Sequence, residues 1–201
     1  ESTVQHYLSA VSAVLSDAKR NEIIQTNPAR MIDLPTTNRM EQHIPTVQEV
    51  QRLLQALSME PRHFRVFYLL AMATGCRRGE LCALQWQDID WEQRSIHICR
   101  SAVKITGDEI FVKEPKTRSG DRYVYFSAQM ENLLREYRRA CQYITTIYDE
   151  RELDTNDFLF RRQGTRLPMT PTTFTWRFKC ILKKNGLPQE LNVHSLRHTA
   201  A

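Results

Sequence analysis

The sequence predicts an α+β protein that is mainly α-helical and contains a small three-stranded antiparallel sheet. Apolar residues recur at helical spacing through long segments toward both ends of the chain. Between these segments, three short runs alternate with period two, as half-buried strands do, and turns containing glycine separate the runs. The three runs, which we expect hairpins to join, are 95–99, 109–112 and 122–126.

Composition is typical of a globular protein. The chain has 201 residues, 41% of them hydrophobic and 25% charged, which is enough for one full domain and part of another. No run approaches the roughly 18 apolar residues of a membrane span. Residues 1–5 show neither an initiator methionine nor a signal-peptide pattern. We therefore expect an excised piece of a cytoplasmic protein with no membrane contact, and five cysteines, an odd number, favour reduced thiols.

Positive charge is concentrated toward the C-terminal side. The net charge of the whole chain is only +5, but residues 161–201 hold eight lysines and arginines against a single glutamate. A polyanion partner such as DNA explains this distribution more simply than a solvated basic surface does.

The first 45 residues predict a helix and a linker. Apolar residues at helical spacing make 3–19 one amphipathic helix that needs a partner, and Asn27-Pro28-Ala29 then breaks the chain. The segment 31–45 is polar and contains proline, as linkers do. We therefore divide the chain into the end of a helical domain at 1–30, a linker at 31–45 and a second domain at 46–201.

Helix signals in the second domain are clear. Thr46-Val47-Gln48-Glu49 is a capping box that opens one helix, and the nearly all-apolar stretch 63–73 predicts a central buried helix that ends at the Gly75 turn. We expect that helix to deliver Arg77 into the interior. Ser127 caps a long helix whose apolar stripe extends to Ile147.

A further helix opens at Thr170-Pro171 and ends at Asn185-Gly186. Its residues Phe174, Trp176 and Phe178 lie beside basic side chains and could stack on nucleic-acid bases. Helical spacing nevertheless favours core packing for this cluster.

Two motifs far apart in the sequence carry candidate chemistry. Arg77 and Glu80 follow the Gly75 turn, and their spacing alone indicates an ordinary helical ion pair. Near the other end, Arg197 follows His194 by three residues in a helix expected to begin near Asn192. Two arginines and a histidine suggest a phosphate ligand, because a guanidinium stays charged and can bond two phosphate oxygens.

Several motifs together carry a family resemblance. They are Ala73-Thr74-Gly75-Cys76-Arg77-Arg78-Gly79-Glu80-Leu81, the turn at 86–90, Pro115-Lys116-Thr117 in a cation-rich connection, and His194-Ser195-Leu196-Arg197-His198-Thr199. In order and spacing they resemble the boxes of the tyrosine recombinases, the phage integrase family, and most of all the integrases of prophages and conjugative elements. The resemblance covers about residues 46–201, and 1–30 look like the end of that family's DNA-binding core-binding domain.

The resemblance implies a role for each matching residue. Arg77 and Arg197 would hold the scissile phosphate of DNA, and His194 would contact that phosphate and assist proton transfer. Glu80 would support Arg77 and the histidine. Lys116 matches the lysine that protonates the leaving 5′ oxygen, and Lys113 is the second candidate for that role.

The implied reaction cuts and rejoins double-stranded DNA at attachment or core sites through a 3′-phosphotyrosyl intermediate. Such a transesterification requires neither a cofactor nor a metal. The resemblance also implies oligomerisation on DNA, accessory DNA-bending proteins as further partners, and association with the bacterial nucleoid.

The family's nucleophilic tyrosine has no match here. It lies some tens of residues after the His-x-x-Arg box, and this chain stops four residues past Arg197. All seven tyrosines precede that box. We therefore expect a catalytic domain cut short before its nucleophile, inactive by itself.

Two alternatives remain. The chain could be a catalytically inactive DNA-binding accessory or regulator with the same fold. His194 and His198, with Cys76 and Cys82, could instead hold zinc, but the cysteine spacing is wrong for such a site.

Overall fold

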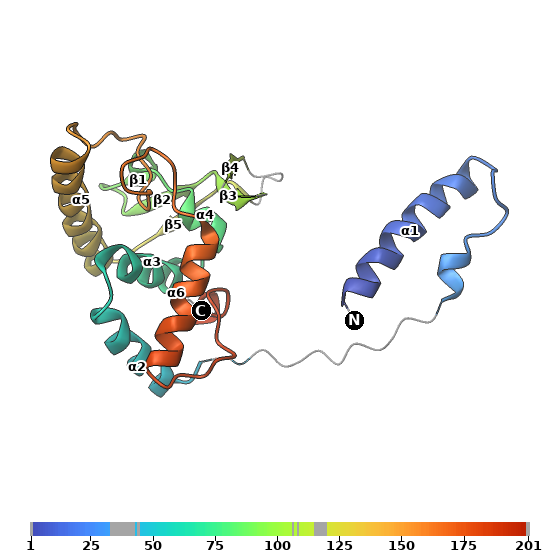
Figure 1. Cartoon of the computed structure of the whole chain (residues 1–201), viewed down its shortest axis with the longest axis horizontal. Helices are drawn as coiled ribbons and strands as arrows, with labels where there is room; N and C mark the ends of the chain where they lie inside the picture. Colours follow the sequence, from blue (N-terminus) through green and yellow to red (C-terminus); the bar gives the residue numbers. More distant parts are fainter. Residues whose placement is uncertain are drawn as a thin grey trace. The chain divides into compact units, whose positions relative to one another are not determined.

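The computed structural model describes residues 2–32, 43, 45–105, 107, 109–114 and 120–199. The chain divides into two units, Glu1–Glu41 and Gln42–Ala201 (Figure 1). Most of the predicted linker at 31–45 lies outside the described residues. The assignment of 1–30 to a core-binding domain stays a prediction.

The first unit pairs a long helix with a single short turn. Helix α1 (Ser2–Arg20) is followed by the 3-10 helix η1 (Pro28–Met31). The amide of Asn27 joins them, because its nitrogen donates to Ser12 and Ser16 while its oxygen caps the Ala29 N–H. The predicted apolar stripe of α1 is largely exposed, with Tyr7 at 71%. This exposure agrees with a helix that needs a partner.

The second unit contains five helices, five strands and two 3-10 helices among its described residues. In chain order they are α2 (Val47–Ser58), α3 (Arg62–Thr74), α4 (Arg78–Cys82), η2 (Trp86–Asp88), β1 (Ile89–Asp90), β2 (Ser95–Ile98), β3 (Ser101–Lys104), β4 (Ile110–Lys113), β5 (Arg122–Tyr125), α5 (Ala128–Tyr148), α6 (Pro171–Lys184) and η4 (Ser195–Thr199). The predicted capping box at Thr46 and Glu49 is formed. The fold class is confirmed as mainly helical with small antiparallel sheets.

Helix α3 is the centre of the core, as the sequence predicts. Figure 1 shows it between α5 and α6. Its Phe67 and Tyr68 are fully buried, and the Phe67 ring stacks on Phe174 of α6 at 3.7 Å between centroids. The Tyr68 hydroxyl donates to the Phe174 carbonyl at 2.7 Å. These contacts fix α6 against α3.

The strands form two sheets rather than the single predicted one. One sheet has the order β1-β2-β5, and the other pairs β3 with β4, all antiparallel. The expectation that 95–99, 109–112 and 122–126 pair with one another is therefore wrong for 109–112, whose partner 101–104 has too mixed a pattern to be recognised. The connection that contains Lys116 joins strands of different sheets, and residues 115–119 themselves lie outside the described part of the chain.

The apolar stripe of α5 leaves the core before the helix ends. Ser127 caps the first turn, and Leu134 and Tyr137 are buried. Ile144 and Ile147 are 40% and 53% exposed, so the predicted stripe is buried only over its first half.

Gly79 lets α4 lie directly against β3. A Cβ added at Gly79 would stand 2.7 Å from the carbonyl oxygen of Ala102 and 2.7 Å from Oγ of Ser101. The backbone carbonyl cannot move without displacing β3. This close approach makes a glycine necessary two residues after Arg77.

We predict that Gly79→Ala destabilises the protein by about 1–3 kcal/mol through overpacking. Helix propensity alone predicts the opposite sign, a gain of about 0.5–1 kcal/mol from alanine in a helix. Urea unfolding followed by circular dichroism measures the difference. A variant as stable as the parent or more stable would show that the contact with Ala102 relaxes freely.

Candidate functional site

A tight turn after α3 places Arg77. Gly75 adopts the left-handed conformation with φ of 60°, and its N–H bonds to the Ala71 carbonyl. The Thr74 hydroxyl donates to the Leu70 carbonyl and accepts from the N–H of Cys76. The chain thus reverses within a few residues, and Arg77 stands at the start of α4 in extended conformation.

Glu80 is the buried centre of the site. Its Oε2 accepts from the Arg77 backbone N–H and from Nη2 of Arg122, each at 2.8 Å. Its Oε1 accepts from Nη1 of Arg77 at 2.9 Å and from Nη1 of Arg122 at 3.3 Å. Both carboxylate oxygens are therefore paired twice. The side chain of Glu80 is 7% exposed.

The side chain of Arg77 is 62% exposed, so the expectation that it lies in the interior is wrong. The turn is anchored in the core, but its arginine extends outward. An exposed guanidinium held by a buried carboxylate can still meet a ligand from solvent. This arrangement suits an anion-binding role better than burial would.

Electrostatics keep Glu80 ionised. Burial by itself raises the pKa of a carboxyl group, but hydrogen bonds from Arg122 and Arg77 outweigh it and hold the pKa of Glu80 at about 2. The same pairing raises the pKa of Arg122. Glu80 is thus a fixed anion over the whole physiological range and does not exchange protons there.

Sequence reasoning missed Arg122. This arginine begins β5, and besides Glu80 it donates to Sγ of Cys76 at 3.7 Å. It is in phase with Val124 and Phe126 on the inward face of the strand, while Tyr123 points outward. The available signal was an arginine at an inward position of an alternating strand, which requires a buried anion as its partner.

Arg197 of the His-x-x-Arg motif lies near the Gly75 turn, although it is far from that turn in the sequence. Asn192 and Ser195 cap each other's backbone N–H groups, and η4 packs on α3 through the fully buried Leu196. Arg197 is half-buried and lies near enough to Cys76 that its charge acts on the pKa of that thiol, which burial raises. Three guanidiniums therefore gather around Cys76 and Glu80.

The other candidate residues are His194 and Lys116. His194 is exposed and precedes η4, which begins at Ser195, so the helix expected near Asn192 does not contain it. Lys116 lies outside the described residues. Across the described part of the chain, no three His, Cys, Asp or Glu side chains are grouped to hold a metal ion.

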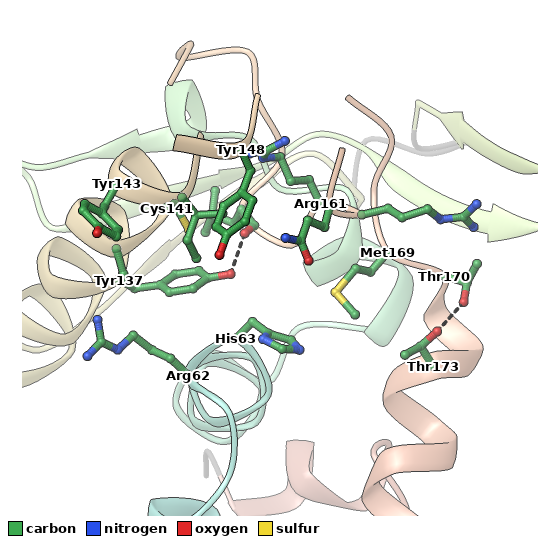
Figure 2. A pocket seen from close by; sticks show the side chains of 15 residues that line it. Arg62, His63, Tyr137, Cys141, Tyr143, Tyr148, Arg161, Met169, Thr170 and Thr173 are labelled. Atoms are coloured by element: carbon green, nitrogen blue, oxygen red, sulfur yellow. Dashed lines mark hydrogen bonds between the residues drawn. The ribbon is translucent and has the colours of Figure 1, made fainter. Parts of the chain in front are cut away.

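A cavity of about 640 Å³ lies elsewhere in the second unit, between the start of α3, the second half of α5 and the segment 159–173 (Figure 2). Tyr137, Tyr148 and Met169 line it, together with His63, whose pKa burial lowers. None of the candidate residues above is part of its lining. The arginine cluster and this cavity are therefore separate features of the second unit.

We predict that Glu80→Gln destabilises the protein by about 2 kcal/mol at pH 7, because the half-buried Arg122 loses its counter-charge. The folded pKa of about 2 lies below the ordinary value of 4.5, so this stabilisation is complete above pH 4.5 and is lost as the pH falls toward 2. Urea unfolding should show that the difference in unfolding free energy between variant and parent is smaller at pH 3 than at pH 7.

Glu131→Gln is the control, because Glu131 also pairs with two arginines but nearer the surface. Its effect on the unfolding free energy should be smaller. A difference that is constant with pH would contradict the assignment.

Known proteins share this sequence pattern and fold. The sequence model of the phage integrase family matches residues 45–201. The ICEBs1 integrase of Bacillus subtilis (strain 168) is 24% identical over 197 residues, covering 98% of this chain and 52% of that protein. The transposase from transposon Tn916 of Enterococcus faecalis is 24% identical over 208 residues, covering 98% and 50%. The chain thus spans about half the length of the curated relatives it matches.

Solved structures agree on the fold. The Tn1549 transposon integrase in complex with transposon right end DNA has a TM-score of 0.83 at 22% identity, covering 100% of this chain and 65% of that one. A lambda integrase tetramer bound to a Holliday junction gives 0.64 at 20% identity, covering 96% and 51%. Within the described residues, no helix is both long and apolar enough to cross a membrane. Because the family model spans most of the sequence, the chain belongs to the phage integrase family of tyrosine recombinases.

Proposed function

We propose that this chain holds the scissile phosphate in a site-specific DNA recombinase that cuts and rejoins DNA through a 3′-phosphotyrosyl intermediate. The observation that carries the proposal is the pairing of Arg77 and Arg122 with one buried carboxylate, with Arg197 near the adjacent Cys76. Membership of the phage integrase family supports it. So do relatives named as an integrase and a transposase of mobile elements, and neighbours solved with DNA.

The two arginine motifs form the phosphate clamp. Negative charge builds on the phosphoryl oxygens in the pentavalent transition state, and guanidiniums already in position stabilise it without reorganising. Arg77 and Arg197 supply these donors, and His194 stands beside Arg197 at the start of its turn. Glu80 orients Arg77 through two hydrogen bonds. Arg122 is the counter-ion that keeps Glu80 ionised in the interior.

The bonds and protons balance without a cofactor. A tyrosine hydroxyl gives up its proton with the help of His194, and its oxygen attacks phosphorus. The bond from phosphorus to the 5′ oxygen breaks, and Lys116 gives that oxygen a proton. One phosphoester bond replaces another, so no ATP is consumed. The nucleophile comes from outside these 201 residues, which alone would be inactive. The buried Tyr68 and Tyr137 do not fit the role of nucleophile, because their hydroxyl groups donate to backbone carbonyls.

The rest of the chain holds the duplex. Residues 1–30 belong to a helical core-binding domain and 46–201 to the catalytic domain, joined by 31–45. The exposed basic side chains of 161–201, which are Arg166, Lys183 and Lys184, contact the DNA backbone at attachment or core sites. The protein oligomerises on that DNA, with accessory DNA-bending proteins, in the bacterial cytoplasm where its substrate lies.

The alternative is an inactive DNA-binding regulator with the same fold. Such a protein needs phosphate contacts but not a buried acid that orients one exposed arginine. The two readings differ in whether the full-length gene product forms a covalent bond to DNA.

We predict a covalent protein–DNA adduct when the full-length gene product is incubated, without metal, with a nicked duplex carrying the attachment core of its element. Arg77→Ala or Arg197→Ala should lower the rate of adduct formation by at least about 100-fold, as loss of one transition-state donor does. Arg162→Ala, which changes a half-buried arginine at the cavity of Figure 2, is the control. DNA binding with no adduct from the unmodified protein would favour the regulator.

We predict that a sulfur leaving group rescues Lys116→Ala. When sulfur replaces the bridging 5′ oxygen, the cut strand leaves as a thiolate, which needs no proton. The variant should therefore cleave this duplex nearly as fast as the parent does. On the ordinary duplex the variant should be slow. Lys113→Ala, three residues earlier on β4, is the matched control and should cleave both duplexes. If Lys113→Ala shows the rescue instead, the roles of the two lysines are exchanged.

A further inference from the structure

Helix α6 presents an exposed tryptophan on its outer face. Phe174 and Phe178 are fully buried, whereas Trp176, between them in sequence, is 67% exposed. Two residues along a helix rotate a side chain by about 200°, so burial of the two phenylalanines forces the tryptophan outward. The expectation that this cluster packs in the core is therefore wrong for Trp176. Thr172 and Lys183, also exposed, lie on the same face.

Both phosphate motifs are attached to α6 beside this face. The guanidinium of Arg78, next to Arg77 in sequence, donates to Oγ1 of Thr175. The ammonium of Lys179 donates to the carbonyls of Gln189 and Leu191, in the segment that leads to His194. These contacts join α6 to both segments that carry the proposed clamp residues.

The chemistry of this face suits nucleic acid. Helix α6 contains four basic residues and no acidic one. Arg177 pairs with Glu60 and Lys179 with the carbonyls above, but Lys183 and Lys184 are exposed. An α-helix fits the major groove, where the apolar group that bases present is the thymine methyl. A solvated indole ring has apolar surface that such a contact would remove from water.

We propose that Trp176 contacts thymine methyl groups in the major groove and so sets base preference near the phosphate held by Arg77 and Arg197. This specificity role rests on the proposed function and deepens it. Thr172 and Lys183 flank the ring on the same face and contact the adjoining groove edges and phosphates.

The test is selection from a duplex library of randomised sequence, using the 201-residue chain, Trp176→Ala, and Tyr148→Ala as control. Tyr148 is an equally exposed aromatic, at 66%, on α5. The parent and Tyr148→Ala should enrich the same motif. Trp176→Ala should lose preference for thymine at one or two adjacent positions and bind the parent's motif at least about fivefold more weakly. Thermal melts should be unchanged, because the ring is exposed.

Replacing those thymines by uracil removes only the methyl groups and supplies the second measurement. Affinity should fall about three- to fivefold per position for the parent and for Tyr148→Ala, and not at all for Trp176→Ala. The salt dependence of binding should be equal in all three, since tryptophan is uncharged. An unchanged motif and an unchanged uracil effect in Trp176→Ala would overturn the inference and leave the recombinase proposal standing. Failure of the parent to bind any duplex would overturn both.

Discussion

The carboxylate of Glu80 is the constraint on which the site depends. An ionised carboxylate at 7% exposure is costly in the interior unless charged hydrogen-bond donors surround it. Arg77 supplies two donors from the adjacent turn and Arg122 supplies two from β5. The ion pair therefore ties the end of α3, the start of α4 and one sheet together. Gly79 allows this geometry, since a side chain there would meet the backbone of β3.

This pairing separates two tasks that a single arginine could not combine. Arg122 satisfies the buried acid, and Arg77 is thereby held in one orientation while most of its side chain remains exposed. The cluster of three guanidiniums and one carboxylate is still net positive, so it attracts an anion. Because the pKa of Glu80 is about 2, the orientation of Arg77 does not change near neutral pH. Any pH dependence of the proposed reaction near neutrality then belongs to the groups that move protons.

Local signals in the sequence predicted the parts that depend on neighbouring residues. The Thr46 capping box, the Gly75 turn and the spacing of Arg77 and Glu80 are all decided within a few residues, and the structure contains each. The charge partner of Arg122 lies 42 positions away in the sequence, and β2 pairs with β5 across an intervening hairpin, and periodicity specifies neither pairing. The single predicted sheet is a failure of this kind, whereas the strand at 101–104 pairs locally with 110–113 and was missed because its pattern is mixed. The prediction of core packing is wrong for Trp176 for another reason. It treats the three aromatic residues as one cluster, although the side chain of Trp176 faces away from those of Phe174 and Phe178.

Helix α6 packs on the core and is bonded to both segments that carry the proposed clamp residues. Its Phe174 stacks on Phe67 of α3, so the helix cannot shift without disturbing the segment that ends at the Gly75 turn. Lys179 and Thr175 bind the two segments that carry the phosphate motifs. Displacing a reacting group by about 1 Å can cost about 100-fold in rate. A DNA-reading face on this helix would therefore place the duplex in the same frame as the clamp, so that a well-matched sequence is also a well-positioned phosphate.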